Sequence, residues 1–392
     1  MRTRQYRISC REVTRWTVTT LVEALDWSSA QTRLHPQRLV QLLVRAAAAM
    51  RSLSAMVREA QAVPSWETVR QALLRYLPAE PRDLLPATTR ALHRRLPKSL
   101  RRRPRTMAID WHLRPFYGSP RTPGVCRGQP KASTKYFFTY ASLLVLRRGQ
   151  SFTVGLTPVA AGETHTTVMA RLLEQAQQAG LQGRQLLLDR GFYGAATIQW
   201  LQQQQLAFLM PMLRRGRSGR SKATSTGTQK FFVRGRRGWT TYTWTAPRRP
   251  GRQRGESITV TVDVCMAPRP KNRTGKKGPL VFACHRLPKR APDAVRQLYR
   301  RRFGIETSYR QLGEGLAASC SRNAVYRLLL VAIALVLRNI WVWLHWQFLA
   351  ERSEHGRRLR LQRLPLRTLT DWIARQLDQW LEIRPGVLTA EL

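Results

Sequence analysis

The N-terminal part of the chain carries apolar side chains at spacings of three and four, which is the period of amphipathic helices. The spacing is clearest over 39–46 and 69–77, and a shorter stretch covers 53–58. A basic segment with two prolines follows at 96–105, where proline disfavours a continuing helix. The pattern therefore predicts an N-terminal helical domain over 1–104.

Two of these predicted helices are separated by a tight turn. After the helix at 53–58, the chain passes a proline and reaches Ser65, which is the expected N-cap of the next helix. The pair is either a helix-turn-helix DNA-binding unit, with Arg70 and Arg75 facing a groove, or an ordinary helical hairpin whose arginines face water. The sequence favours the two interpretations equally.

Beyond the basic segment the apolar period shortens to two, which is typical of strands. Three successive strands are followed by alternating helices and strands, the order of a ribonuclease H-like mixed sheet of the α/β class, flanked by helices. In this order the ends of the first and fourth strands can lie side by side. We place the first part of this core at 105–212. The predicted elements are strands at 107–110, 137–146 and 151–159, a helix at 166–178, a strand at 185–189, a helix at 195–205 and a strand at 206–212.

The next segment, 213–288, is rich in Arg, Gly and Ser. Clear strands at 257–264 and 280–284 indicate a β-rich insertion with basic loops between its hairpins. The aromatic residues of 239–244 alternate along the chain, which is more typical of one packed face of a strand than of nucleotide stacking. We therefore assign packing to the aromatics and nucleic-acid contact to the loops.

A second part of the core is predicted at 289–350, ahead of a C-terminal helical tail at 351–392. Its most apolar run, 328–337, ends at Arg338 and is about half of the ~20 residues that a membrane span needs. We predict a buried helix over 324–350 and no membrane partner.

The balance of charge is extreme, because 68 Lys and Arg face only 22 Asp and Glu, for a formal net charge of +46. This excess predicts a polyanionic partner, and its spread along the whole chain favours nucleic acid over a membrane surface. Codon bias would explain the preference for Arg over Lys, but not the scarcity of acids. The five cysteines are scattered without a CxxC pair, which argues against structural zinc and a disulfide framework. No signal peptide is recognisable, so we expect a reducing cytoplasm.

Three of the scarce acids lie where metal ligands are expected. Asp110 and Asp189 each end a predicted strand, and Glu306 follows in a later helix. Oxygen ligands favour hard ions such as Mg²⁺ or Mn²⁺, and such a set can hold two ions about 3.5 to 4 Å apart for phosphoryl transfer. Singly, each acid has a plainer role, in a turn or a local ion pair; Glu306, for example, is four residues from both Arg302 and Arg310. Together, in this order and with this fold pattern, they favour a metal site.

On these residues the chain resembles the DDE insertion-sequence transposases that have a ribonuclease H-like core and a β insertion before the last acid. Asp110 follows a strand, and the Asp-Arg-Gly-Phe run at 189–192 is similar to the second-acid motif of that family. Residues 299–306 have the spacing of its tyrosine-arginine-glutamate signature. The resemblance covers roughly 105–345. It departs at Gly313, where the family often has a lysine.

The resemblance implies that Asp110, Asp189 and Glu306 are catalytic and bind two Mg²⁺ or Mn²⁺ ions. It implies cleavage of double-stranded DNA at the ends of an insertion sequence, followed by attack of the freed 3′ hydroxyl on target DNA, with no covalent enzyme intermediate. It also implies a homodimer assembled on DNA, in the nucleoid of a prokaryotic cytoplasm. The predicted DNA contacts are Tyr299, Arg302, Arg310 (in place of the missing lysine), Arg190, Arg70 and Arg75.

Two alternatives remain at the level of sequence. One is a metal-dependent nuclease that cuts DNA without joining it. The other is a domesticated, non-catalytic DNA-binding protein, against which the retention of all three acids argues, because a binder gains nothing from negative charge opposite phosphates. His112 and His165 lie near the predicted site, and we interpret them as structural.

Overall fold

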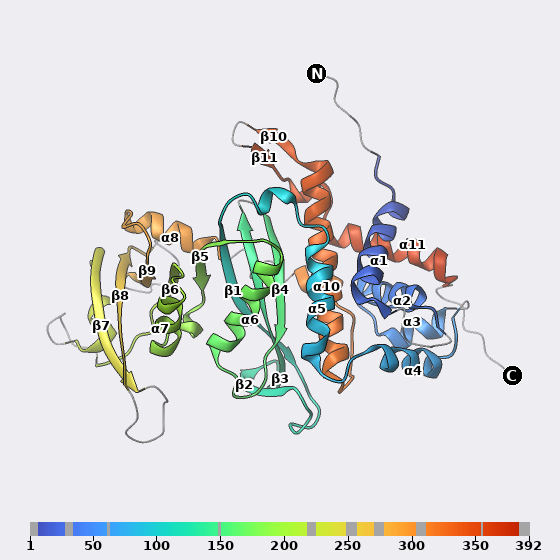
Figure 1. The fold of residues 1–392 in the computed structure, drawn as a ribbon, viewed down its shortest axis with the longest axis horizontal. Helices are drawn as coiled ribbons and strands as arrows, with labels where there is room; N and C mark the ends of the chain where they lie inside the picture. The colour runs from blue at the N-terminus through green and yellow to red at the C-terminus, as the bar shows by residue number, and fades with distance from the viewer. Residues whose placement is uncertain are drawn as a thin grey trace.

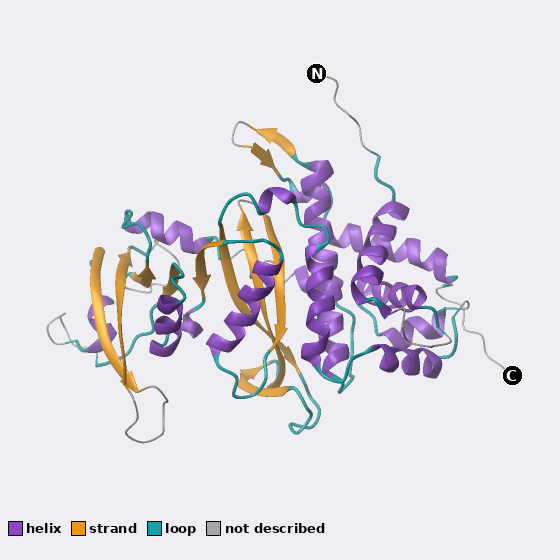
Figure 2. Cartoon of the chain, in the orientation of Figure 1, coloured by secondary structure: helices purple, strands orange, loops and turns teal. Residues whose placement is uncertain are grey.

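The computed structural model describes residues 7–27, 34–60, 63–147, 150–217, 225–247, 257–269, 278–302, 311–353 and 356–383. The molecule is elongated: a long sheet fills its middle and one end, and a group of helices forms the other end (Figure 1). Figure 2 shows the same division by secondary structure, with one long helix standing between the sheet and the helical end.

The main sheet has nine strands within the described residues, in the order β2-β3-β1-β5-β6-β9-β8-β7, with β4 paired to β3. Strand β1 is antiparallel to β3 but parallel to β5, and β5 is parallel to β6. This mixture confirms the predicted mixed α/β sheet. The strands are β1 (Arg105–Pro115), β2 (Val125–Lys131), β3 (Thr134–Arg147), β4 (Gln150–Pro158), β5 (Gly183–Leu188), β6 (Phe208–Pro211), β7 (Gly238–Pro247), β8 (Ser257–Ala267) and β9 (Leu280–His285).

The first strand is longer than predicted. It does not end at Asp110 but continues to Pro115, still paired with β3, so Asp110 lies in the middle of the strand. The apolar run stops at Asp110 because large apolar and polar side chains alternate over 111–114, so the rest of the strand has one apolar and one polar face. Strand β2, which was not predicted, pairs with the start of β3.

Helices cover the sheet. Helix α6 packs on β3 and β4, α5 and α10 pack on β4, and α7 and α8 pack on β8. The predicted alternation of helix and strand is thus confirmed, with ends that differ by a few residues. These helices are α5 (Leu85–His93), α6 (His165–Gln178), α7 (Ala195–Gln203), α8 (Pro292–Arg300) and α10 (Ala324–Leu344).

Helix α10 is the buried helix that the sequence predicts. Residues 324–349 form a helical stretch that is long and apolar enough to cross a membrane, but 94% of its most apolar part is buried inside the protein. Its polar residues are tied to β4: Arg338 donates to the carbonyl and hydroxyl oxygens of Ser151 at 2.9 and 2.7 Å. Asn339 accepts from the amide of Thr153 and donates to its carbonyl, at 3.0 and 2.7 Å. These bonds replace water at the interface and fix the register of the helix against the sheet.

The helical end of the molecule contains both ends of the described chain. Helix α11 returns to pack on α2 and α1, and Arg45 of α2 forms a two-pronged ion pair with Asp378 of α11, at 2.6 and 3.0 Å. The C-terminal segment is therefore part of the helical layer, and the division into domains stays a prediction. The helices of this end are α1 (Cys10–Leu25), α2 (Pro36–Ala49), α3 (Leu53–Glu59), α4 (Trp66–Tyr76) and α11 (Leu366–Leu381); the hairpin β10 (Glu351–Ser353) and β11 (Gly356–Arg358) comes between α10 and α11 in the chain.

The strands predicted for the β-rich insertion are present, and they extend the main sheet, because β9 pairs with β6 of the core. Their aromatic side chains pack against one another and against the core. Tyr242 stacks on Trp244, with ring centroids 5.2 Å apart, and Trp244 stacks on Tyr193, at 5.6 Å. The aromatics of this strand thus have the packing role that their alternation predicts.

Candidate active site

Asp110 and Asp189 come together because β1 and β5 are neighbouring parallel strands. Ile109 pairs with Leu188 in the register of the two strands, so the next residue of each chain segment is an aspartate at the same level of the sheet. Strand β5 ends there, whereas β1 continues. The predicted proximity of these two acids is therefore realised in the structure, although only Asp189 lies at a strand end.

One guanidinium group spans both carboxylates. Arg302, just after α8, places Nη1 at 3.4 Å from Oδ2 of Asp110 and Nη2 at 3.6 Å from Oδ1 of Asp189. The Arg302 side chain is 7% exposed and that of Asp110 16%, whereas that of Asp189 is 44% exposed. The arrangement is a buried cation held between two acids, one of which opens to solvent.

The backbone fixes the other oxygen of Asp110, and an aromatic cluster supports both acids from the opposite side of the sheet. The amide of Trp111 donates to Oδ1 of Asp110 at 2.9 Å. Trp111 stacks on Phe192, with ring centroids 5.6 Å apart, and His165 contacts both rings. Phe192 is the last residue of the Asp-Arg-Gly-Phe run, so the motif locks the turn after Asp189 onto the strand that carries Asp110.

Tyr299 is buried beside this site. Its ring packs against Phe282, with centroids 5.1 Å apart, and the guanidinium carbon of Arg302 lies 5.6 Å from its centroid. Burial raises the pKa of the Tyr299 phenol well above its ordinary value, although Arg302 opposes the shift. A phenol that stays protonated is a poor nucleophile, and the absence of a covalent enzyme intermediate stays a prediction.

The third predicted acid, Glu306, and Arg310 lie outside the described residues. Within the described ranges, no group of three or more His, Cys, Asp or Glu side chains is placed to hold a metal ion. Asp110 and Asp189 nevertheless offer carboxylate oxygens side by side, and they already hold one cationic group, Arg302, between them. This donor set suits a hard divalent cation.

The comparisons with known proteins decide the family. The family model of the transposase DDE domain matches residues 101–337, which begin before β1 and end within α10. The chain belongs to this family. It is a DNA transposase, and DDE transposases depend on divalent cations.

A solved structure shares the fold of the transposase. The chain is similar to the piggyBac transposase in a cryo-EM structure of a synaptic complex with hairpin DNA, with a TM-score of 0.51 and 12% sequence identity. The match covers 96% of this chain and 80% of that chain. At this identity the likeness concerns the fold alone. No curated protein sequence matches the transposase significantly.

The other predicted DNA contacts are spread over the transposase. Arg190 is exposed next to Asp189. Arg70 and Arg75 are exposed on α4, where Arg70 is paired with Glu67 at 2.6 Å, and Ser65 caps the helix as predicted. The DNA roles of these residues stay predictions. Tyr299 and Arg302, by contrast, are 7% and 6% exposed, so neither contacts DNA without a movement of the segment that carries them.

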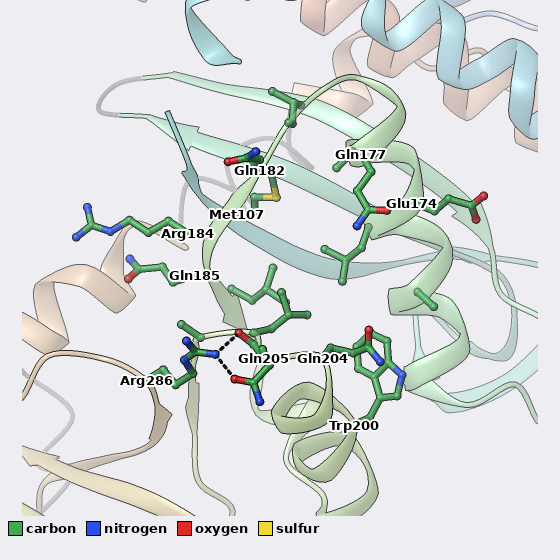
Figure 3. Close-up of a pocket in the computed structure, with 18 residues that line it drawn as sticks. Met107, Glu174, Gln177, Gln182, Arg184, Gln185, Trp200, Gln204, Gln205 and Arg286 are labelled. Atoms are coloured by element: carbon green, nitrogen blue, oxygen red, sulfur yellow. Dashed lines mark hydrogen bonds between the residues drawn. The ribbon is translucent and has the colours of Figure 1, made fainter. Parts of the chain in front are cut away.

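The transposase also has a cavity of about 570 Å³ far from the acids, between α6, α7 and the start of β5 (Figure 3). Glutamine side chains dominate its polar lining, and Arg286 reaches Gln205 at its rim. Asp189 follows the opposite end of β5, so this cavity takes no part in the chemistry of the acids.

Proposed function

We propose that this transposase cuts DNA at the ends of an insertion sequence and joins the freed ends to target DNA. The observation that carries the proposal is the pair of carboxylates on neighbouring parallel strands, Asp110 and Asp189. In a very basic protein, these two acids hold the guanidinium group of Arg302 between them. In the first step a water oxygen attacks the phosphorus atom and the 3′ oxygen leaves. In the second step that 3′ oxygen attacks a phosphodiester of the target, and a target oxygen leaves.

Asp110, Asp189 and Glu306 would hold Mg²⁺ or Mn²⁺, with two ions per site as the natural complement of three acids. When bound, these cations would neutralise charge on the phosphodiester and favour ionisation of the attacking group. Asp110 is oriented for this role by the Trp111 amide and by the strand itself, whereas Asp189 is the acid open to solvent and DNA. Arg302 and a divalent cation would compete for the same carboxylate oxygens. Binding of the cation would therefore displace Arg302, which would shift toward the phosphodiester.

Double-stranded DNA is the partner that the net charge of +46 supports, and one structural neighbour is a transposase solved with hairpin DNA. Joining two element ends calls for two active sites, so we propose a homodimer assembled on DNA. A polycation of this kind would be held at the nucleoid of a prokaryotic cytoplasm by the same electrostatic attraction.

The test uses labelled element ends, a target plasmid and Mg²⁺. The wild type is expected to yield both cut ends and strand-transfer products. Asp189→Asn is expected to abolish both, while DNA affinity stays equal or rises because a repulsive charge is removed; Asp371→Asn, on the remote helix α11, is the matched control. Cut ends without joined products would identify a nuclease. Tight DNA binding by a wild type that neither cuts nor joins would identify a non-catalytic DNA-binding protein.

A further inference from the structure

The face of β1 that carries Asp110 continues into a cationic cluster. Side chains of alternate strand residues share a face, so Asp110, His112 and Arg114 line one side of the sheet. On the neighbouring strand β3, Tyr140 lies opposite His112, and Phe138 lies opposite Arg114. The surface that begins at the catalytic acid thus continues through a tyrosine and an arginine.

A second arginine reaches the same place from the start of α10. The guanidinium carbon of Arg327 lies 4.7 Å from the ring centroid of Phe138, the residue opposite Arg114. Its Nε and Nη2 donate to the carbonyl oxygens of Ser321 and Ser319, at 2.5 and 3.1 Å. Arg327 is therefore fixed in position, and its Nη1 forms no hydrogen bond with the part of the chain that the structure describes.

Among the residues that the structure describes, this cluster contains no anion. Across the described residues, Arg114 forms no ion pair or hydrogen bond, and Tyr140 is 3% exposed with a hydroxyl group that has no partner. Burial lowers the pKa of Arg114 and of Arg327, and the two guanidinium groups repel each other. Partly buried cations and an orphan hydroxyl cost free energy unless a partner satisfies them.

We propose that Arg114, Arg327 and Tyr140 form a binding site for a phosphodiester group of the DNA strand that enters the active site, and that the phosphate reaches the buried Tyr140 hydroxyl once the side chains that cover it move aside. The inference rests on the proposed function. Guanidinium groups match phosphate oxygens in geometry and charge, and a tyrosine hydroxyl can donate to the same oxygens. Four residues of strand span about 13 Å, so this phosphate lies a few nucleotides from the one at Asp110. The site positions the strand and takes no part in bond breaking.

The sharpest variant is Tyr140→Phe, because its two readouts move in opposite directions. Removal of an unpartnered buried hydroxyl leaves the free protein equally or more stable. The same change removes a hydrogen bond to a charged phosphate and is expected to weaken binding of a fluorescent DNA duplex about tenfold. Thermal unfolding of the full chain without DNA and fluorescence anisotropy with DNA measure the two effects. A stable Tyr140→Phe protein with unchanged DNA affinity would overturn the inference.

Arg114 is tested through salt dependence. Arg114→Gln is expected to reduce the slope of log K against log salt by about 0.9, the effect of one phosphate contact, whereas Arg114→Lys retains the slope. Arg375→Gln is the control, because Arg375 is exposed on α11 and belongs to no such cluster. An equal loss of slope in the Arg375 variant would mean that any arginine contributes as much, and would count against a built site.

The outcomes also separate this inference from the proposed function. A wild type that does not bind DNA ends both. If the wild type binds DNA with a steep salt slope, and Arg114→Gln and Tyr140→Phe bind with the same affinity and slope, the phosphate site is overturned and the proposed function is not. The last comparison measures thermal unfolding with inorganic phosphate at constant ionic strength. If phosphate stabilises the wild type but not Arg114→Gln, and both proteins bind DNA equally well, then the site binds a free anion and not the DNA backbone.

Discussion

Replacement of Arg302 by methionine tests the idea that an arginine and a divalent cation share one site. Methionine keeps most of the apolar volume of the side chain and removes the charge. In the variant, the carboxylates of Asp110 and Asp189 would face each other with no guanidinium between them. We expect lower stability without metal, and a larger stabilisation by added metal than in the wild type.

The magnitude follows from the two contacts of Arg302. At 3.4 and 3.6 Å, each charge pair is worth about 5 kcal/mol at an effective dielectric constant of 20. Desolvation of the guanidinium offsets much of this, and the contact with Asp189 is screened because that side chain is 44% exposed. We therefore expect a net loss of about 2 kcal/mol in the free energy of unfolding when metal is absent.

Cation affinity should change in the opposite sense. Without a competing guanidinium, the acids are expected to bind Mg²⁺ or Mn²⁺ at least about tenfold more tightly, which adds about 1.4 kcal/mol to the stabilisation by a given excess of cation. Urea unfolding in EDTA and in increasing Mg²⁺ measures both effects. Arg296→Met is the matched control, because Arg296 lies on α8 and pairs with Asp293 at 2.9 Å, away from the two acids.

The reasoning is refuted if Mg²⁺ stabilises Arg302→Met and the wild type by the same amount. It is also refuted if Arg296→Met gains as much from the cation, because the effect would then be one of general charge. Arg302→Lys should fall between the wild type and the methionine variant, since a lysine keeps the charge but cannot span both carboxylates as a planar fork.

Three further predictions concern the fold. Asn339→Ala should lower the free energy of unfolding by about 3 kcal/mol in a urea titration, because the buried amide and carbonyl of Thr153 lose their partner. Burial lowers the pKa of His345, so protonation of the unfolded state reduces stability as the pH falls below the unfolded pKa of about 6.5. His345→Gln should therefore flatten the fall in unfolding temperature below about pH 6.5. Gly155→Ala should cost about 1 to 3 kcal/mol, because an added Cβ would lie 3.1 Å from the Leu172 side chain where β4 meets α6.

The sequence contains enough information to place the two acids together. The order of strands and the apolar runs before Asp110 and Asp189 predict neighbouring strands, and the register of β1 and β5 realises this. The role of Arg302 could not be predicted in the same way. Arg302 is four residues from Glu306 along the chain, a spacing that predicts an ion pair between the two side chains on one helix. Its contacts with Asp110 and Asp189 depend instead on where α8 ends relative to the sheet.

Burial explains the other differences. Tyr299 belongs to a motif whose resemblance predicts DNA contact, yet its ring lies against Phe282 of β9 in the structure. Nothing in the local sequence indicates that β9 runs beside α8, because that contact depends on the addition of β7 to β9 to the edge of the core sheet. Similarly, the sequence predicts a C-terminal helical tail over 351–392, but not that its helix α11 closes the N-terminal helical layer through the Arg45–Asp378 pair.

The surplus of arginine is therefore not simply a measure of DNA-binding surface. Arg338 and Arg302 are buried at 4% and 6% exposure; Arg338 donates to oxygens of β4, and the charge of Arg302 lies between the two acids. Arg45 and Arg327 likewise have oxygen partners inside the protein. Arg114 differs, because it shares their partial burial but has no oxygen partner among the described residues. An arginine that is desolvated in the free protein and still unpaired is a stronger indication of a specific phosphate contact than any exposed arginine, whose charge water already satisfies.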